Sequence, residues 1–340
     1  MIAALAHPIV RSRALIRARG RAARKTAPPA PLLLDWDARK TEQFKSADAP
    51  MRFRHDLEST GLFGDAALIA LLDAHPSHLL DVCTMGAPDH PVFPNKFRTG
   101  DFRKTDPESL LRAAKDGRIW INVREAMNVH AQYRDVLDRL YGELARETGN
   151  AAVNAKGGVL ISSSITKVPY HVDKTEVVLW HVRGRKRIYV YPTGPDFIPD
   201  PSYEATLTDI INDDLPYHPS MEAAAQTFDL KPGEAVTWPL NSPHRVDNRS
   251  FCVSVTTEYS TRESALKNSA MLANAMLRSR FGRDPSYAAD GPATRRIKSV
   301  AGRMLDRAGL VPRTAGTDWV TFEVLPDGTL RDVEPFVRDF

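Results

Sequence analysis

The chain has 340 residues, of which 42% are hydrophobic and 26% are charged, and its formal net charge is +4. This composition is typical of a soluble globular protein that can bury a substantial core. No stretch approaches the roughly 20 apolar residues that a membrane-spanning helix needs. Cys83 and Cys252 lie far apart, so we expect free thiols, a reducing compartment and a cytoplasmic protein with no membrane span.

The positive charge is concentrated in residues 1–30, which hold seven arginines and lysines and no acidic residue. Residues 31–340 therefore carry a net charge of −3, which argues against a broad phosphate-binding surface and against nucleic-acid binding as the main function. We predict that residues 1–30 form a basic flexible arm. An arm that contacts nucleic acid or an anionic membrane, or a targeting peptide, would also fit an arginine-rich segment without acids.

Residues 31–150 are predicted to form a mixed α/β flank. Helices are expected at 35–45, 61–75 and 130–147, where apolar residues recur at helical spacing, and Pro76 ends the second of them. Strands are expected at 79–83 and 118–123. Residues 86–106 are rich in proline, glycine and aspartate, which predicts a loop.

The pattern changes to short β-rich runs in residues 151–261. These runs lie at 158–165, 175–183, 186–191, 226–230, 234–238 and 251–259. Turn residues such as Lys231-Pro232-Gly233 separate them, and residues 197–224 are expected to form a loop-rich insertion. Several short strands with turns between them predict an antiparallel barrel or a double-sheet sandwich.

A helical pattern returns in residues 262–340. Helices are expected at 262–281 and 293–309, followed by a terminal hairpin with a turn at Asp327-Gly328. The apolar faces of these helices would fit either a homodimer contact or a cover over the barrel. The whole chain is therefore predicted to be α+β, mainly β, with a single β core between helical flanks.

Three residues in the β-rich region have the types and spacing of metal ligands. In His171-Val172-Asp173 the histidine and the carboxylate would point the same way from a strand, with Val172 facing outward. His244 could complete a set of two histidines and one carboxylate, which suits non-haem Fe(II) and leaves coordination positions open. A lone His-x-Asp also occurs by chance, and His181 and His218 are competing histidines.

A cation is needed if such a site binds the far carboxylate of a 2-oxoacid inside a barrel. Lys186 has the same strand parity as Ile188 and Val190, which favours an inward side chain, whereas a bulge at Gly184 would shift this register. The neighbouring arginines are better explained as a solvated hairpin tip, at Arg183, Arg185 and Arg187.

These motifs occur in a recognisable order: His171-x-Asp173, Lys186 thirteen residues later, Trp238-Pro239 and Pro243-His244. The order resembles the Jumonji-C or cupin-like Fe(II)/2-oxoglutarate oxygenases, with the asparaginyl hydroxylase of hypoxia-inducible factor and bacterial cupin-like relatives as the nearest branch. The resemblance covers roughly residues 118–260. It implies a double-stranded β-helix, or jelly roll, in which His171, Asp173 and His244 are the catalytic iron ligands and Lys186 binds the distal carboxylate of 2-oxoglutarate.

The resemblance further implies hydroxylation of a protein or peptide side chain, or of a small molecule, with consumption of O2 and release of succinate and CO2. Two positions depart from the nearest branch, because Val168 and Val177 replace a threonine and an asparagine there. A further partner for the co-substrate would then come from one of four hydroxyl groups, those of Ser162, Ser164, Tyr170 and Thr256. A cupin-like binding or regulatory protein without turnover is the alternative function.

Overall fold

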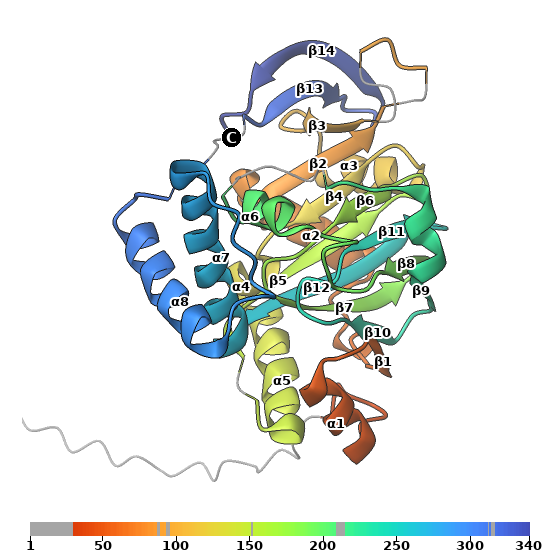
Figure 1. Cartoon of the computed structure of the whole chain (residues 1–340). Coiled ribbons are helices and arrows are strands. Elements are labelled where there is room, and N and C mark those ends of the chain that lie inside the picture. The colour runs from red at the N-terminus through yellow and green to blue at the C-terminus, as the bar shows by residue number, and fades with distance from the viewer. Residues whose placement is uncertain are drawn as a thin grey trace, which may run out of the picture. The chain divides into compact units, whose positions relative to one another are not determined.

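Figure 1 shows the computed structural model, which describes residues 30–86, 89–92, 96–150, 152–208, 215–311, 313 and 317–340. Apart from Ala30, the predicted basic arm lies outside the described residues. Part of the predicted insertion, residues 209–214, also lies outside them. Residues Pro31–Phe340 form one compact unit.

Eight consecutive strands build the centre of this unit and are divided between two sheets. They are β5 (Val153–Ser162), β6 (Lys167–His171), β7 (Glu176–Arg183), β8 (Lys186–Val190), β9 (Gln226–Leu230), β10 (Glu234–Thr237), β11 (His244–Asn248) and β12 (Cys252–Ser260). One sheet contains the order β10-β7-β12-β5, and the other is β6-β11-β8-β9. Every pairing among the eight is antiparallel. This alternation between two sheets is the topology of a jelly roll, so the predicted double-stranded β-helix is confirmed.

The larger sheet continues on both sides of the jelly roll to ten strands. Its additional strands are β1 (Met51–Arg54), β2 (Leu80–Met85), β3 (Phe97–Asp101), β4 (Trp120–Val123), β13 (Trp319–Val324) and β14 (Leu330–Val337). The predicted terminal hairpin is confirmed, and its first strand pairs in parallel with β3. The prediction of a loop over 86–106 was wrong at β3, because β3 gains its hydrogen-bonding partners from β2 and from β13, which lies over 200 residues further along the chain.

Eight α-helices and three short 3₁₀ helices surround the sheets in the part of the chain that the structure describes. The α-helices are α1 (Ala38–Ser46), α2 (Asp65–Ala74), α3 (Pro107–Lys115), α4 (Ala126–Val129), α5 (Ala131–Thr148), α6 (Asp200–Thr208), α7 (Arg262–Phe281) and α8 (Pro292–Arg307). The 3₁₀ helices are Glu58–Thr60, Ser77–Leu79 and Pro219–Ala224. None of the described helices combines the length and the apolar character that crossing a membrane requires.

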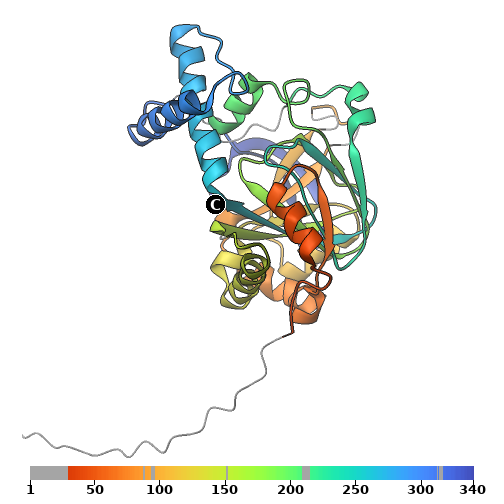
Figure 2. The ribbon, with the colours of Figure 1, turned by 60° about the horizontal axis from the view of Figure 1, so that its bottom comes forward.

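Helix α6 lies where a loop-rich insertion was predicted, so that prediction was wrong for residues 200–208. The segment has almost no helical amphipathicity of its own. Tyr203 and Leu207 nevertheless become buried against Met271 of α7 and Val172, which shows that tertiary packing stabilises this helix. The predicted helices at the C-terminal end are confirmed as α7 and α8, which Figures 1 and 2 show packed side by side.

Two apolar clusters lie on opposite faces of the larger sheet. The larger cluster packs the sheet against the helices and contains Trp180, whose indole nitrogen donates to Thr257 Oγ1 at 2.9 Å. The smaller cluster fills the space between the two sheets with residues such as Leu179, Ile188 and Val246. This second cluster forms the wall against which the candidate site is built.

Two buried histidines belong to the core rather than to a metal site. His181, one of the competing histidines, lies 3.0 Å from both Ser254 Oγ and the Gly184 carbonyl oxygen through its two ring nitrogens. Burial, together with the charge of Lys186, lowers the pKa of His181 to about 3. Burial also lowers the pKa of His55, which packs edge-on against Trp180, to about 4.

We expect these two histidines to make the protein acid-sensitive. Below pH 6.5 the unfolded chain binds protons that the folded protein cannot accept, so the free energy of unfolding should fall as the pH falls. At pH 5.5 the loss from the pair should be about 3 kcal/mol relative to pH 7.5. Urea unfolding at both pH values checks this, and His181→Gln should reduce the difference between the two pH values by about 1.4 kcal/mol. An unchanged pH dependence in that variant would refute the contribution of His181.

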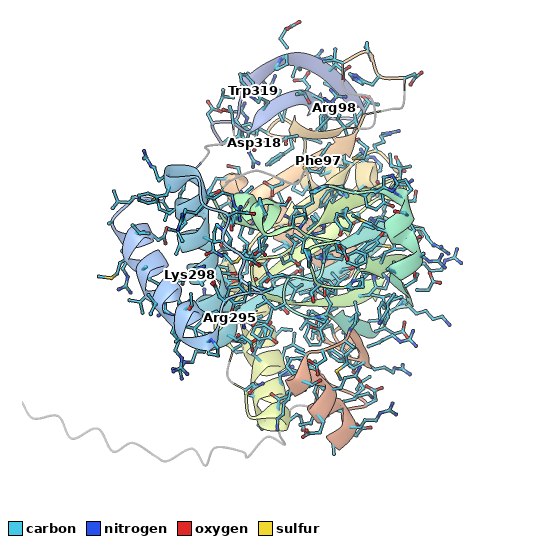
Figure 3. All side chains as sticks on the ribbon, viewed as in Figure 1. Phe97, Arg98, Arg295, Lys298, Asp318 and Trp319 are labelled. Atoms are coloured by element: carbon cyan, nitrogen blue, oxygen red, sulfur yellow. The ribbon has the colours of Figure 1, made fainter. Side chains whose placement is uncertain are left out.

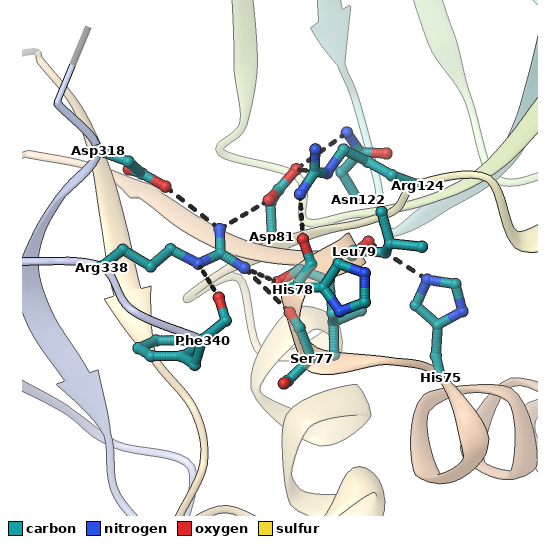
Figure 4. A network of polar contacts seen from close by, with 11 residues as sticks. His75, Ser77, His78, Leu79, Asp81, Asn122, Arg124, Asp318, Arg338 and Phe340 are labelled. Carbon is teal, nitrogen blue, oxygen red and sulfur yellow. Dashed lines mark hydrogen bonds and ion pairs between the residues drawn. The ribbon is translucent and has the colours of Figure 1, made fainter. Parts of the chain in front are cut away.

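The buried side chain of Arg338, which follows the edge strand β14, links the end of that strand to β2 (Figure 4). Its guanidinium donates to Asp81 Oδ1 at 2.8 Å and lies 3.3 Å from Asp318 Oδ2. It also donates to three backbone oxygens, those of Ser77, Leu80 and Phe340. At the opposite edge of the hairpin, Arg98 of β3 (Figure 3) donates to Thr321 O and Asp332 Oδ1, both at 2.7 Å.

We expect Arg338→Lys to destabilise the protein by about 3 kcal/mol, because lysine keeps the charge but cannot reach several acceptors at once. Urea unfolding monitored by circular dichroism measures the change. Arg52→Lys is the matched control, since Arg52 is half exposed and its ion pair with Glu234 is long, at 3.8 Å. The control should change stability by less than about 0.5 kcal/mol. Equal effects of the two substitutions would contradict the anchoring role of Arg338.

Candidate metal centre

Strand pairing brings the three predicted metal ligands together. His171 is the last residue of β6 and His244 is the first residue of β11, and the two residues are direct partners in the antiparallel register. Asp173 follows β6 by two residues. One potential ligand atom from each of these side chains lies within 4.8 Å of the other two. The fold therefore brings His171 and Asp173 together with His244, which lies 73 positions after His171 in the chain, so that two imidazoles and one carboxylate converge.

Hydrogen bonds select the tautomer of both histidines. His171 Nδ1 lies 2.9 Å from the Pro169 carbonyl oxygen, and His244 Nδ1 lies 3.1 Å from the Ser242 carbonyl oxygen. A carbonyl oxygen can only accept, so each Nδ1 carries the proton and each Nε2 keeps its lone pair. His244 Nε2 lies 3.4 Å from Asp173 Oδ2. Nε2 atoms with free lone pairs beside a carboxylate form a donor set that fits a divalent metal ion.

The surroundings keep His244 neutral and fix its ring. Its side chain is buried, and burial holds its pKa well below the ordinary value. The Trp238 ring packs on the His244 ring with 4.3 Å between centroids. Asn241 Nδ2 donates to the Asp173 backbone oxygen at 2.9 Å and holds the loop that follows β6. A neutral, oriented imidazole is the form that binds a metal.

The three side chains open into a cavity of about 230 Å³ between the two sheets. Its walls are mainly apolar, and Val168 and Val177, the two departures noted in the sequence, are among them. The polar atoms outside the triad come from few residues, and these include Thr256 and Glu258. Phe97, Trp120 and Trp238 contribute aromatic surface. The cavity can thus hold a small molecule directly beside the three ligands.

Lys186 lies in the same barrel interior but does not line this cavity. Its side chain is only 3% exposed, and it shares the inward face of β8 with Ile188 and Val190. Lys186 pairs with Asn248 of β11, four residues from His244, so the two levels are about 13 Å apart along the strand. Within the described residues its ammonium makes no ion pair, and burial lowers its pKa to about 8.

Comparison with known proteins gives distant structural likenesses. No protein-family model matches the chain, and no curated protein matches it in sequence. The chain is similar to a ribosomal oxygenase. That protein, YcfD of Escherichia coli, gives a TM-score of 0.43 and 14% identity in its complex with cobalt and succinic acid, over 82% of this chain and 67% of that one.

The same protein in complex with cobalt and 2-oxoglutarate gives a TM-score of 0.42 and 15% identity over the same shares of the two chains. An oxalate decarboxylase of Bacillus subtilis gives a TM-score of 0.22 and 12% identity, over 34% of this chain and 24% of that one. At these levels of similarity the function of this chain has to be inferred from its own side chains.

Of the four hydroxyl residues predicted to contact the co-substrate, one lines the cavity and three do not. Thr256 of β12 lines the cavity. Tyr170 points away from it, because its hydroxyl donates to the Phe197 carbonyl oxygen at 2.8 Å and its ring packs on Tyr191. Ser162 is buried opposite Cys252, and Ser164 is exposed in the turn after β5, so neither lines the cavity.

Sequence reasoning did not assign a role to two aromatic residues and one glutamate that line the cavity. Phe97 and Trp120 come from β3 and β4, and Glu258 comes from β12. The alternation of β12 offered a signal for Glu258, which has the same parity as Thr256. No such signal existed for Phe97, since β3 was expected to be a loop.

Proposed function

We propose that this protein is a non-haem Fe(II) oxygenase that uses 2-oxoglutarate as co-substrate. The observation that carries the proposal is the convergence of His171, Asp173 and His244, with both Nε2 lone pairs free, at the end of an apolar cavity. Three protein ligands leave further coordination positions open on the metal. Such an iron supplies the activation of O2 together with the bound 2-oxoacid.

The residues of the chain have separate tasks in this proposal. His171, Asp173 and His244 hold the metal, and the Pro169 and Ser242 carbonyl groups orient the two imidazoles. Lys186 pairs with the distal carboxylate of 2-oxoglutarate, since a buried cation that has no ion-pair partner among the described residues favours an anionic ligand. The apolar walls exclude water from the reacting centre.

The proposed reaction is the hydroxylation of a side chain of a protein or peptide, with release of succinate and CO2. YcfD is a ribosomal oxygenase that has been crystallised with cobalt and 2-oxoglutarate, and a comparable use of 2-oxoglutarate here accords with the donor set of this chain. A small-molecule substrate would fit the cavity volume of about 230 Å³ as well. The choice of substrate does not affect the first test.

The first test is performed without a primary substrate. Fe(II) and 2-oxoglutarate are added to the full chain under anaerobic conditions, and the charge-transfer absorption of a chelated 2-oxoacid is expected. Admission of O2 should then yield succinate through uncoupled turnover. Absorption without succinate would favour the alternative, a cupin-like binding protein, and absence of both would overturn the proposed function.

We further propose that α8 forms a homodimer contact. Ile297, Val300 and Met304 recur at spacings of three and four residues on α8 and are exposed by 70%, 59% and 66%. Three large apolar side chains on one face of a helix would be buried by a second copy.

Met304→Glu should shift the protein toward the monomer in size-exclusion chromatography with light scattering. The control Ile165→Glu alters an exposed apolar residue elsewhere and should leave the mass unchanged. A monomeric wild-type protein at micromolar concentration would contradict this contact.

A further inference from the structure

The indole nitrogen of Trp120 is a buried hydrogen-bond donor that has no partner in the described part of the chain. Trp120 Nε1 is buried and finds no acceptor among the residues that the structure describes, although the ring lines the cavity beside the metal centre. A buried N–H that lacks a partner costs about 1–3 kcal/mol. Such a group needs an explanation, and a ligand that enters the cavity would supply one.

The register of three adjacent strands places Trp120 at the Lys186 end of the barrel. Trp120 of β4 pairs with Ser162 of β5, and Ser162 pairs with Cys252 of β12. The Cys252 thiol in turn donates to the backbone oxygen of Arg185, the residue before Lys186, at 3.2 Å. Trp120 and Lys186 therefore approach the same end of the interior from opposite sheets.

The indole ring is also held in a defined plane. Phe97, which projects from β3 (Figure 3), packs edge-on against it with 5.3 Å between centroids and an interplanar angle of 73°. A fixed ring aims its N–H in one direction. The donor is therefore preorganised, and a ligand that accepts this hydrogen bond does not have to order the side chain first.

We propose that the Trp120 N–H donates to the distal carboxylate of bound 2-oxoglutarate, which Lys186 pairs with from the other side. This inference rests on the proposed function. Trp120 and Lys186 are donors only, and one carboxylate offers two oxygens to them. Val168 lines the cavity but has no hydroxyl to give, so Trp120 takes the place of a hydroxyl donor at this end. A cation or an apolar ligand would leave the N–H unpaired.

The first experiment measures ligand binding to the full chain loaded with Zn(II), by calorimetry. Trp120→Phe keeps an aromatic ring against Phe97 and removes the donor together with part of the ring volume, so the Kd for 2-oxoglutarate should rise about tenfold or more. The Kd for pyruvate, a 2-oxoacid without the distal carboxylate, should stay the same. The matched control is Trp36→Phe, because Trp36 Nε1 already donates to Thr41 Oγ1 at 3.0 Å.

The second experiment observes the donor itself in the wild-type protein and stays informative if Trp120→Phe folds poorly. The indole N–H resonance of Trp120 should move downfield on addition of 2-oxoglutarate and move little on addition of pyruvate. An unmoved resonance, or an equal loss of affinity for both acids in Trp120→Phe, would overturn the inference. If wild-type protein binds 2-oxoglutarate and Lys186→Ala weakens that binding, the proposed function stands even when Trp120 has no part in it.

Discussion

Asp173→Ala is expected to abolish tight binding of Fe(II) and to reduce succinate formation by about three orders of magnitude or more. The carboxylate is the only anionic member of the set formed with His171 and His244, so its loss removes both a ligand atom and the charge that offsets the metal. Two neighbouring imidazoles, 4.0 Å apart between ring centroids, would then have to hold a dication alone.

Metal affinity is measured directly, by competition of the purified variant with a chromophoric chelator, and succinate is assayed separately. His171→Ala should give the same double loss. The control is His218→Ala, because His218 is an exposed histidine whose Nδ1 lies 2.9 Å from Ser220 Oγ and which stands apart from the triad. A variant of Asp173 that retains both wild-type metal affinity and turnover would remove the basis of the proposed function.

The metal set could be predicted from sequence because its geometry is largely local. The short spacing of His171 and Asp173 keeps their side chains near each other even though Asp173 lies beyond the end of β6, and Val172 between them is buried against Tyr203 and Met271. His244 was harder to place, since it begins a short strand in a segment interrupted by proline and glycine. Its direct pairing with His171 is a property of the register.

Short strands and turn residues along residues 151–261 predicted an antiparallel barrel or a double-sheet sandwich, and the resemblance of the motifs implied the jelly roll. Strand β3 and helix α6 could not be predicted, because each depends on partners that are distant in the chain. Gly100 of β3 shows the same dependence: a methyl group added there would meet the ring of Phe322, more than 200 residues away. Contacts between residues that are far apart in the chain produce no periodic pattern in either segment, so the sequence does not predict them.

Of the two residues proposed to bind the co-substrate, the sequence pointed to Lys186 but not to Trp120. Strand parity favoured an inward Lys186 but left open a shift of register at Gly184, and the structure buries the lysine. The sequence predicted that the second hydrogen-bond donor would be a hydroxyl group. Three of the four predicted hydroxyl residues, Tyr170, Ser162 and Ser164, do not line the cavity. An indole is usually interpreted as packing. Only the tertiary structure shows that the Trp120 nitrogen has no acceptor among the described residues.

Lys186→Met is expected to raise the stability of the protein without co-substrate and to weaken the binding of 2-oxoglutarate at the same time. Methionine fills a similar volume without a charge, and replacing a buried uncompensated cation by an apolar side chain stabilises proteins by about 1–4 kcal/mol. Loss of the partner of a buried carboxylate costs about 2–5 kcal/mol of binding, so the Kd should rise by about thirtyfold or more. The affinity for Fe(II) should be retained, since Lys186 lies about 13 Å along the strands from the level of His244.

The pH dependence of 2-oxoglutarate binding gives an independent measurement of the same side chain. Burial lowers the pKa of Lys186 to about 8 in the protein without ligand, so the ammonium form is present below pH 8 and is lost as the pH rises through 8. An anionic ligand binds the ammonium form, and wild-type affinity should therefore weaken between pH 7 and pH 9, whereas Lys186→Met should show no such change. Lys231→Met, at an exposed lysine in a turn, is the control and should behave as the wild type does. Normal 2-oxoglutarate affinity in Lys186→Met would contradict the prediction. It would mean that a group other than Lys186 binds the distal carboxylate.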